Sequence, residues 1–174
     1  YMITEAETKT QIKILIAAHC FSDSPHGHGT HLFSDFYEWI NFLGLISDKT
    51  DYDWYIKSHP DFKESTKKIL EEFAKKYVKF NILPSDSSHH QIISEGINFA
   101  LTCVGTIGFE YAMLDIPVIN ASQNNPHIAY DFNIHPKNIE EYSNILSNLE
   151  EVKIDINKKQ IEEYYYMNNI YNTN

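Results

Sequence analysis

The sequence contains no arginine, and its 14 basic residues are all lysines. They stand against 24 Asp and Glu residues, so the formal net charge is −10 over 174 residues. A chain this acidic offers no basic surface to a nucleic-acid backbone, and we expect no nucleic-acid partner. Without a guanidinium group, an anionic ligand has to be bound by lysine, histidine, hydroxyl or backbone N–H groups.

Cysteine and long apolar runs are also scarce. The two cysteines, Cys20 and Cys103, lie far apart in apolar segments, and we interpret them as reduced core thiols, with a disulfide as the alternative. No apolar run reaches the ~18 residues that a membrane span needs. The first ten residues lack the apolar centre of a signal peptide. We therefore expect a cytoplasmic protein without a transmembrane segment.

Hydrophobic residues make up 43% of the chain, enough for a sizeable core. Short apolar segments alternate with segments of helical periodicity. The predicted strands are 12–20, 51–58, 78–83, 97–105 and 116–120. Strands that are apolar throughout are typical of a parallel sheet covered by helices on both faces. The sequence therefore predicts an α/β fold, a single Rossmann-like doubly wound parallel sheet of about five strands.

The chain divides into three parts along its length. We expect residues 1–11 to be a disordered or added start, residues 12–150 to form the sheet domain, and residues 151–174 to form a C-terminal helix or tail. The helix after the first strand is expected to end at Gly44. The polar segment 121–137 is longer than most connections in a compact domain, which favours a functional role.

Ligands of doubly wound sheets bind beyond the carboxyl ends of the strands, so the loops after the strands are the places to examine. The loop after the first strand is rich in histidine: His19, His26, His28 and His31. Their spacing matches no zinc motif. We interpret the segment as a ligand loop in which His19 and Asp23 face a substrate, with a solvated loop or a metal site as alternatives.

A lysine and a histidine follow the second strand. Pro60 holds His59 in an extended conformation just before a predicted helix, with Lys57 two residues earlier. A histidine, a lysine and the N–H groups at a helix start together suit a phosphate. The alternative, supported equally by the spacing, is that His59 only packs on the helix start.

Small residues follow the fourth strand. Gly105, Thr106 and Ile107 lead into a helix that carries Glu110 in its first turn. Glycine lets a ligand approach the backbone closely, and the N–H groups there suit a phosphate. The segment lacks the Gly-Lys-Ser/Thr of a Walker loop and the spacing of a dinucleotide fingerprint. Glu110 is placed to accept hydrogen bonds from ribose hydroxyls, although its position alone favours a solvated side chain.

The segments IKSHP, 56–60, and CVGTIGFEYAMLDIPVIN, 103–120, together resemble the C-terminal, donor-binding half of GT-B glycosyltransferases. The resemblance is to bacterial capsule and surface-polysaccharide synthesis proteins in particular. The segment AAHCFSDSPHG also resembles an opening loop of these proteins, and the likeness covers roughly residues 12–136. Two positions depart from the pattern: Asp115 stands where a glycine is usual, and Tyr111 where an alanine is usual.

The resemblance implies that residues 12–150 bind a nucleotide-sugar donor. Its phosphate would be contacted by residues that follow the second and fourth strands: Lys57, His59, Pro60, Gly105, Thr106 and Ile107. Glu110 would hold the ribose. His19 and Asp23 would face the cleft where the acceptor arrives, as the catalytic residues of this half.

The resemblance also implies a missing half. A GT-B enzyme has two such domains, and the absent N-terminal one would supply the catalytic base and bind a saccharide or lipid-linked acceptor. We expect the chain alone to bind nucleotide weakly and to transfer little, and the full-length enzyme to associate peripherally with the inner face of the membrane. No Asp-x-Asp follows a strand, so we expect no metal and no cofactor. A polyol-phosphate transferase, a sugar-nucleotide epimerase and a non-catalytic binding module are the alternatives.

Overall fold

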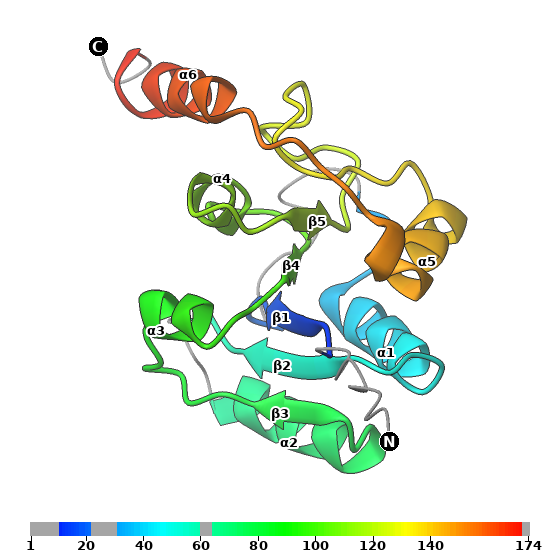
Figure 1. Cartoon of the computed structure of the whole chain (residues 1–174). Coiled ribbons are helices and arrows are strands. Elements are labelled where there is room, and N and C mark those ends of the chain that lie inside the picture. Colours follow the sequence, from blue (N-terminus) through cyan, green and yellow to red (C-terminus); the bar gives the residue numbers. More distant parts are fainter. Residues whose placement is uncertain (1–10, 22–30, 60–63, 172–174) are drawn as a thin grey trace, which may run out of the picture.

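Five parallel strands form one sheet in the order β3-β2-β1-β4-β5 in the computed structural model of the chain (Figure 1). The structure describes residues 11–21, 31–59 and 64–171. The strands are β1 (Lys13–Ala17), β2 (Asp53–Lys57), β3 (Phe80–Ile82), β4 (Phe99–Thr102) and β5 (Val118–Asn120). The helices are α1 (Phe36–Ser47), α2 (Glu64–Lys76), α3 (His89–Ser94), α4 (Ile107–Met113), α5 (Ile139–Ser147), the 3-10 helix η2 (Leu149–Glu151) and α6 (Lys158–Asn169).

The central strand β1 explains why the sheet is buried on both faces. It pairs with β2 on one side and with β4 on the other. Its residues Ile14, Leu15 and Ile16 are all fully buried. Successive side chains of a strand point to opposite faces, so an uninterrupted apolar run requires cover on both. The predicted α/β fold with a single Rossmann-like parallel sheet is confirmed.

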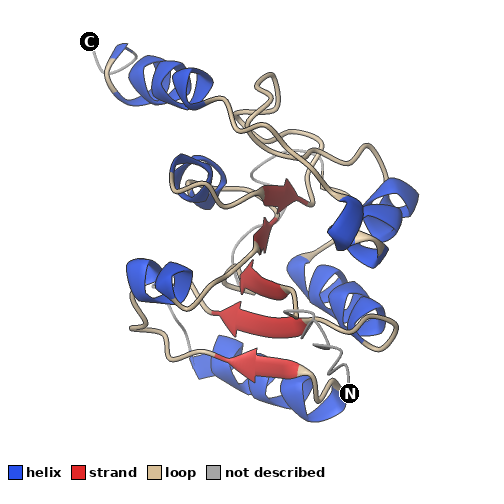
Figure 2. Ribbon diagram, in the orientation of Figure 1, coloured by secondary structure: helices blue, strands red, loops and turns tan. Residues whose placement is uncertain are grey.

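Helices cover both faces of the sheet (Figure 2). Helices α1, α2 and α5 pack in the core that contains Ile14 and Ile16. Helices α3 and α4 pack against Leu15 on the other face, through Ile92 and Tyr111. Helix α6 contacts α4 and contributes to a third cluster of buried residues.

Helix α1 begins after a capping aspartate but does not end where expected. The carboxylate of Asp35 accepts a hydrogen bond from the backbone N–H of Glu38, which caps the helix. The predicted end at Gly44 is wrong, because the helix continues to Ser47. Gly44 is buried, and a side chain there would collide with the ring of Tyr77. The glycine therefore marks close packing between elements and not a helix terminus.

The predicted polar loop 121–137 folds back onto the sheet. Ile134 lies beside Ile119 of β5 in a parallel bridge, and the N–H of Asn120 donates to the Ile134 carbonyl at 3.0 Å. Phe132 is fully buried. Although the segment is polar in sequence, it covers the β5 edge of the sheet.

The C-terminal residues form the expected helix, α6. Tyr164 is buried, whereas Tyr165 and Tyr166 are 48% and 52% exposed. Both Cys20 and Cys103 are buried thiols, as predicted. None of the helices in the described ranges combines the length and apolar character that crossing a bilayer requires. Residues 1–10, for which we expect a disordered start, lie outside these ranges.

Candidate functional site

The candidate site lies at the carboxyl edge of the sheet. The chain leads from β1 to β2 on one side, while β4 pairs with β1 on the other, so the strand order switches between β1 and β4. Ligands of doubly wound sheets bind beyond the carboxyl ends of the strands at such a switch point. The predicted site residues that the structure describes all follow β1, β2 or β4, and they therefore belong to this edge.

His19 joins the ends of β1 and β4 at the switch point. Its Nε2 lies 3.2 Å from the Thr102 hydroxyl oxygen, and the backbone N–H of Cys103 points at the same nitrogen from 3.4 Å. The His19 ring stacks on Phe36 of α1, with the ring centroids 4.3 Å apart. These contacts hold the imidazole in one orientation. Asp23, its predicted partner, lies outside the described residues.

Lys57 is the last residue of β2 and is only 5% exposed. Its Nζ donates to the backbone carbonyl of Ser85 at 3.0 Å. Among the described residues, no carboxylate lies within ion-pair distance of this ammonium group. A buried charge without an ionic partner is costly, so the site is suited to receive an anion.

His89 and Tyr111 form a hydrogen-bonded pair beside Lys57. The Nδ1 of His89, at the start of α3, lies 2.6 Å from the hydroxyl oxygen of Tyr111 on α4. The two rings meet edge to face, with centroids 5.5 Å apart. Tyr111 is 1% exposed, and its burial raises the pKa of the hydroxyl well above the usual value, so it stays protonated.

Lys57, His89, Glu110 and Tyr111 are called the edge cluster below. Burial lowers the pKa of His89, and the ammonium of Lys57 lowers it further, while the carboxylate of Glu110 acts in the opposite direction. The His89 ring is therefore uncharged near neutral pH. The structure thus brings two predicted residues, Lys57 and Glu110, together around a histidine that sequence reasoning missed.

The segment after β4 lies open at the same edge. Gly105 has φ +117°, a conformation that L side chains rarely adopt, and no atom of the described residues lies within 4 Å of the place where its Cβ would be. Gly105, Thr106 and Glu110 are exposed, and Ile107 is half-buried. The glycine is therefore explained by backbone conformation, and it leaves space beside the backbone.

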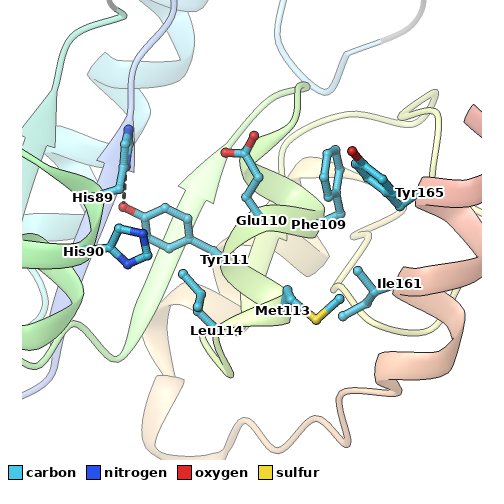
Figure 3. Close-up of a pocket in the computed structure, with 9 residues that line it drawn as sticks. All are labelled: His89, His90, Phe109, Glu110, Tyr111, Met113, Leu114, Ile161 and Tyr165. Atoms are coloured by element: carbon cyan, nitrogen blue, oxygen red, sulfur yellow. Dashed lines mark hydrogen bonds between the residues drawn. The ribbon is translucent and has the colours of Figure 1, made fainter. Parts of the chain in front are cut away.

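A pocket of about 480 Å³ opens beside His89 and Glu110. Apolar side chains of α4 and α6 line much of it: Phe109, Met113, Leu114, Ile161 and Tyr165. In Figure 3, the Glu110 carboxylate and the His89 ring extend to one side of α4, whereas Met113 and Leu114 extend to the other. The charged groups thus lie at the rim of an apolar pocket of small-molecule size.

The remaining predicted residues lie outside the edge cluster. His59 is exposed, two residues beyond the end of β2. Pro60, predicted to fix it, lies outside the described residues. The structure places His59 at the carboxyl edge and, unlike Lys57 and Glu110, does not bring it into the edge cluster.

Sequence reasoning missed His89, Tyr111 and Ser85. Ser85 and His89 follow β3, in a loop and short helix outside the three loops predicted to contact a ligand. The adjacent pair His89 and His90 at the start of that helix was the available signal. Tyr111 was noticed only as a departure from the resemblance, and its hydroxyl turns out to be the partner of His89.

A second polar cluster, called the inner cluster below, lies behind β5 and consists of His127, Asn133 and His135. The rings of the two histidines have centroids 5.5 Å apart, and His127 Nδ1 lies 3.3 Å from the Asn133 side-chain nitrogen. His127 is 1% exposed, and a side chain at Gly108 would collide with its ring. Burial lowers the pKa of both His127 and His135 to about 4, with the His135 charge adding to the effect on His127. Both rings are therefore uncharged at neutral pH.

Comparisons with known proteins identify no relative: no family model matches the chain, and no curated protein matches it. In the part of the chain that the structure describes, no three His, Cys, Asp or Glu side chains come together in a way that could hold a metal ion.

Proposed function

We propose that this chain is the donor-binding domain of a bacterial glycosyltransferase for capsule or surface polysaccharide, and that it binds a nucleotide sugar at the carboxyl edge of its sheet. The observation that carries the proposal is Lys57, whose ammonium is buried with one carbonyl partner and no described carboxylate within ion-pair distance. A phosphate would supply the missing negative charge. The motif resemblance adds the chemical class of the ligand.

The phosphate would lie between the ends of β2 and β4. Lys57 would contribute the charge, since the chain has no arginine to do so. His59 would contact the phosphate from the exposed end of β2, and Thr106 would offer its hydroxyl and backbone N–H. The open space beside Gly105 would let the ligand approach the backbone there.

The nucleoside would extend toward α4. Glu110 is exposed in the first turn of α4, where its carboxylate can accept hydrogen bonds from the ribose hydroxyls. The pocket beside Glu110 offers apolar surface to a flat base. In this arrangement, the ribose would lie at the charged rim of the pocket and the base against its apolar wall.

Sugar transfer requires that the nucleotide leave with its developing negative charge stabilised. Lys57 and the backbone N–H groups after β4 would provide this stabilisation. The base that deprotonates the acceptor would come from a second domain. His19, held by Thr102 and Phe36, would shape the acceptor side of the site together with Asp23. Alone, the chain would bind nucleotide and transfer little.

The proposal is tested by isothermal titration of the chain with CMP, CDP, UDP and GDP at low salt. We expect at least one of them to bind. Lys57→Met keeps the length of the side chain and removes its charge, so we expect affinity to fall about tenfold or more. Binding of none of the four nucleotides would contradict the proposal.

Lys79→Met is the matched control. Lys79 also donates to a backbone carbonyl, that of Thr50, but it precedes β3 at the opposite edge of the sheet. We expect this variant to bind like the wild type. His59→Ala should cost about 2 kcal/mol of binding free energy if His59 donates a charge-assisted hydrogen bond to phosphate. Unchanged affinity would remove His59 from the site while leaving Lys57 in it.

A further inference from the structure

We propose that His89 is the second basic group of the anion site beside Lys57, and that it takes up a proton when a phosphate-bearing ligand binds. The inference rests on the proposed function, because it assigns a further binding residue and a pH dependence to the same site. It makes Tyr111 a positioning residue that holds the His89 ring.

The geometry of His89 leaves one ring nitrogen for a ligand. Its Nδ1 is engaged by the Tyr111 hydroxyl at 2.6 Å, and in Figure 3 the other end of the ring points away from Tyr111, to the side where the Glu110 carboxylate lies. His89 is half-buried at the start of α3, so the ring is held in place but accessible. A ligand oxygen at the carboxyl edge would meet Nε2.

The Tyr111 hydroxyl suits both protonation states of the ring. A tyrosine hydroxyl can donate to the Nδ1 of a neutral imidazole, and it can accept from the Nδ1–H of an imidazolium. In the neutral state with Tyr111 donating, Nε2 carries the single ring proton. When the ring takes up a proton from solvent, Nδ1 becomes a donor to the Tyr111 oxygen and Nε2–H remains directed at the ligand. No other group has to move.

The charges around His89 explain why a ligand is needed for the uptake. Lys57 at the end of β2 and His90 on α3 disfavour the imidazolium, whereas Glu110 on α4 favours it. Tyr111 on α4 is neutral. The effects of burial and of Lys57 together outweigh that of Glu110, so the pKa of His89 lies below its usual value. A phosphate between Lys57 and His89 would offset the lysine charge and add its own, which favours the protonated ring.

The test is nucleotide titration at about pH 7 in buffers of different ionisation enthalpy, which counts the protons taken up on binding. The probe is whichever of CMP, CDP, UDP and GDP binds. A terminal phosphate titrates near pH 6 by itself, so the uptake by His89→Gln is subtracted from that of the wild type. Glutamine can still contact the Tyr111 hydroxyl but cannot take up the proton.

We expect the wild type to take up a fraction of a proton more than His89→Gln. We also expect the affinity of His89→Gln to be about tenfold lower at pH 6, since a charge-assisted hydrogen bond is lost, and closer to that of the wild type at pH 8. His90→Gln is the neighbouring control, because His90 is the adjacent histidine and has the smallest of the charge effects on His89. Its proton uptake on nucleotide binding should stay close to that of the wild type and clearly above that of His89→Gln.

A second measurement observes the histidine rings of the wild type directly and uses His89→Gln only to assign the signal. An NMR titration of the wild-type histidine rings should show one ring whose pKa rises when the nucleotide binds, and this resonance should be absent from His89→Gln. Nucleotide binding with equal proton uptake by the wild type and His89→Gln would overturn this inference and leave the proposed function standing. Absence of binding by the wild type would overturn both.

Discussion

The edge cluster and the inner cluster both hold histidines whose pKa is lowered by burial, but they differ in charge and access. The edge cluster contains the ammonium of Lys57 and the carboxylate of Glu110, and it borders a pocket of about 480 Å³. The inner cluster contains only neutral groups at pH 7, and its residues His127 and Asn133 pack against α4 at Gly108. Burial lowers a histidine pKa in both places, so a shifted pKa alone does not identify a ligand site.

The lowering of a histidine pKa by burial has different consequences in the two clusters. In the inner cluster, protonation has no ligand to compensate it and can only oppose folding. In the edge cluster, a ligand anion can supply the compensation, so protonation becomes coupled to binding. Changes in the inner cluster should therefore alter the free energy of unfolding, whereas changes in the edge cluster should also alter nucleotide binding.

The largest expected effect is loss of stability in mild acid. The pKa of both His127 and His135 is about 4 in the folded chain against 6.5 when unfolded. Between these values the unfolded chain binds more protons, so stability is complete above about pH 6.5 and falls as the pH drops toward 4. We expect a loss of about 5 kcal/mol from the pair by pH 4.5, measured by urea denaturation. His135→Gln should reduce this loss, and an unchanged pH dependence would contradict the account.

The next effect concerns a glycine of α4 that packs against the inner cluster. A Cβ at Gly108 would collide with the His127 ring, so Gly108→Ala should destabilise the chain by about 2 kcal/mol. Gly105→Ala meets no neighbouring atom but must adopt φ +117°, and about 1 kcal/mol is expected there. Thermal or urea denaturation distinguishes them. Equal stability of Gly108→Ala and the wild type would show that the inner cluster is not tightly packed.

Two tyrosines give a contrast of about the same size in stability, with a difference in binding as well. Tyr142→Phe would leave the fully buried indole N–H of Trp39 without its partner, so we expect a loss of about 2 kcal/mol. Tyr111→Phe would release His89, which is half-buried and within reach of water, and about 1 kcal/mol is expected. Only Tyr111→Phe should also weaken nucleotide binding. Weaker binding by both variants would indicate a general loosening of the fold.

The smallest effect is expected at Asp115. This residue has φ +62°, a left-handed conformation that glycine adopts without cost, and its carboxylate accepts from Lys158 Nζ at 2.7 Å on the surface. Asp115→Gly removes the cost of the left-handed backbone conformation and also removes an exposed ion pair. The free energy of unfolding should therefore change by less than about 0.5 kcal/mol. Asp115→Ala loses the ion pair without relief and should cost about 1 kcal/mol. A large loss in Asp115→Gly would mean that the ion pair to Lys158 anchors α6.

The fold was predictable because the strands are buried on both faces. A run such as Ile14–Ile16 has no polar face, and this pattern alone indicates a covered parallel sheet. The motif that this chain resembles has a glycine at the position of Asp115. The backbone at Asp115 is left-handed, a conformation that glycine adopts without cost. The helix end predicted at Gly44 was wrong. In sequence, a glycine that ends a helix cannot be distinguished from a glycine that leaves room for a neighbouring ring, here that of Tyr77.

The site was only partly predictable. Lys57 was found because it stands at the end of β2, and Glu110 because it lies in the first turn of the helix after β4. His89 was not, because its contact with Tyr111 depends on the crossover from β3 to β4, which passes β2 and β1 and brings α3 beside α4. Such a contact follows from strand order, which the pattern of strands and helices does not specify. The inward course of segment 121–137 was also missed. Its residues are polar, and their polarity gave no sign that several of them are buried.

The most direct test of the central claim is an NMR titration of the assigned backbone amides with the tightest-binding nucleotide. The account predicts that the largest shifts appear at Lys57, His89 and the residues 105–110, with little change at His135 behind β5. Shifts confined to the segment 121–137, or spread evenly over the chain, would contradict the assignment of the carboxyl edge as the ligand site.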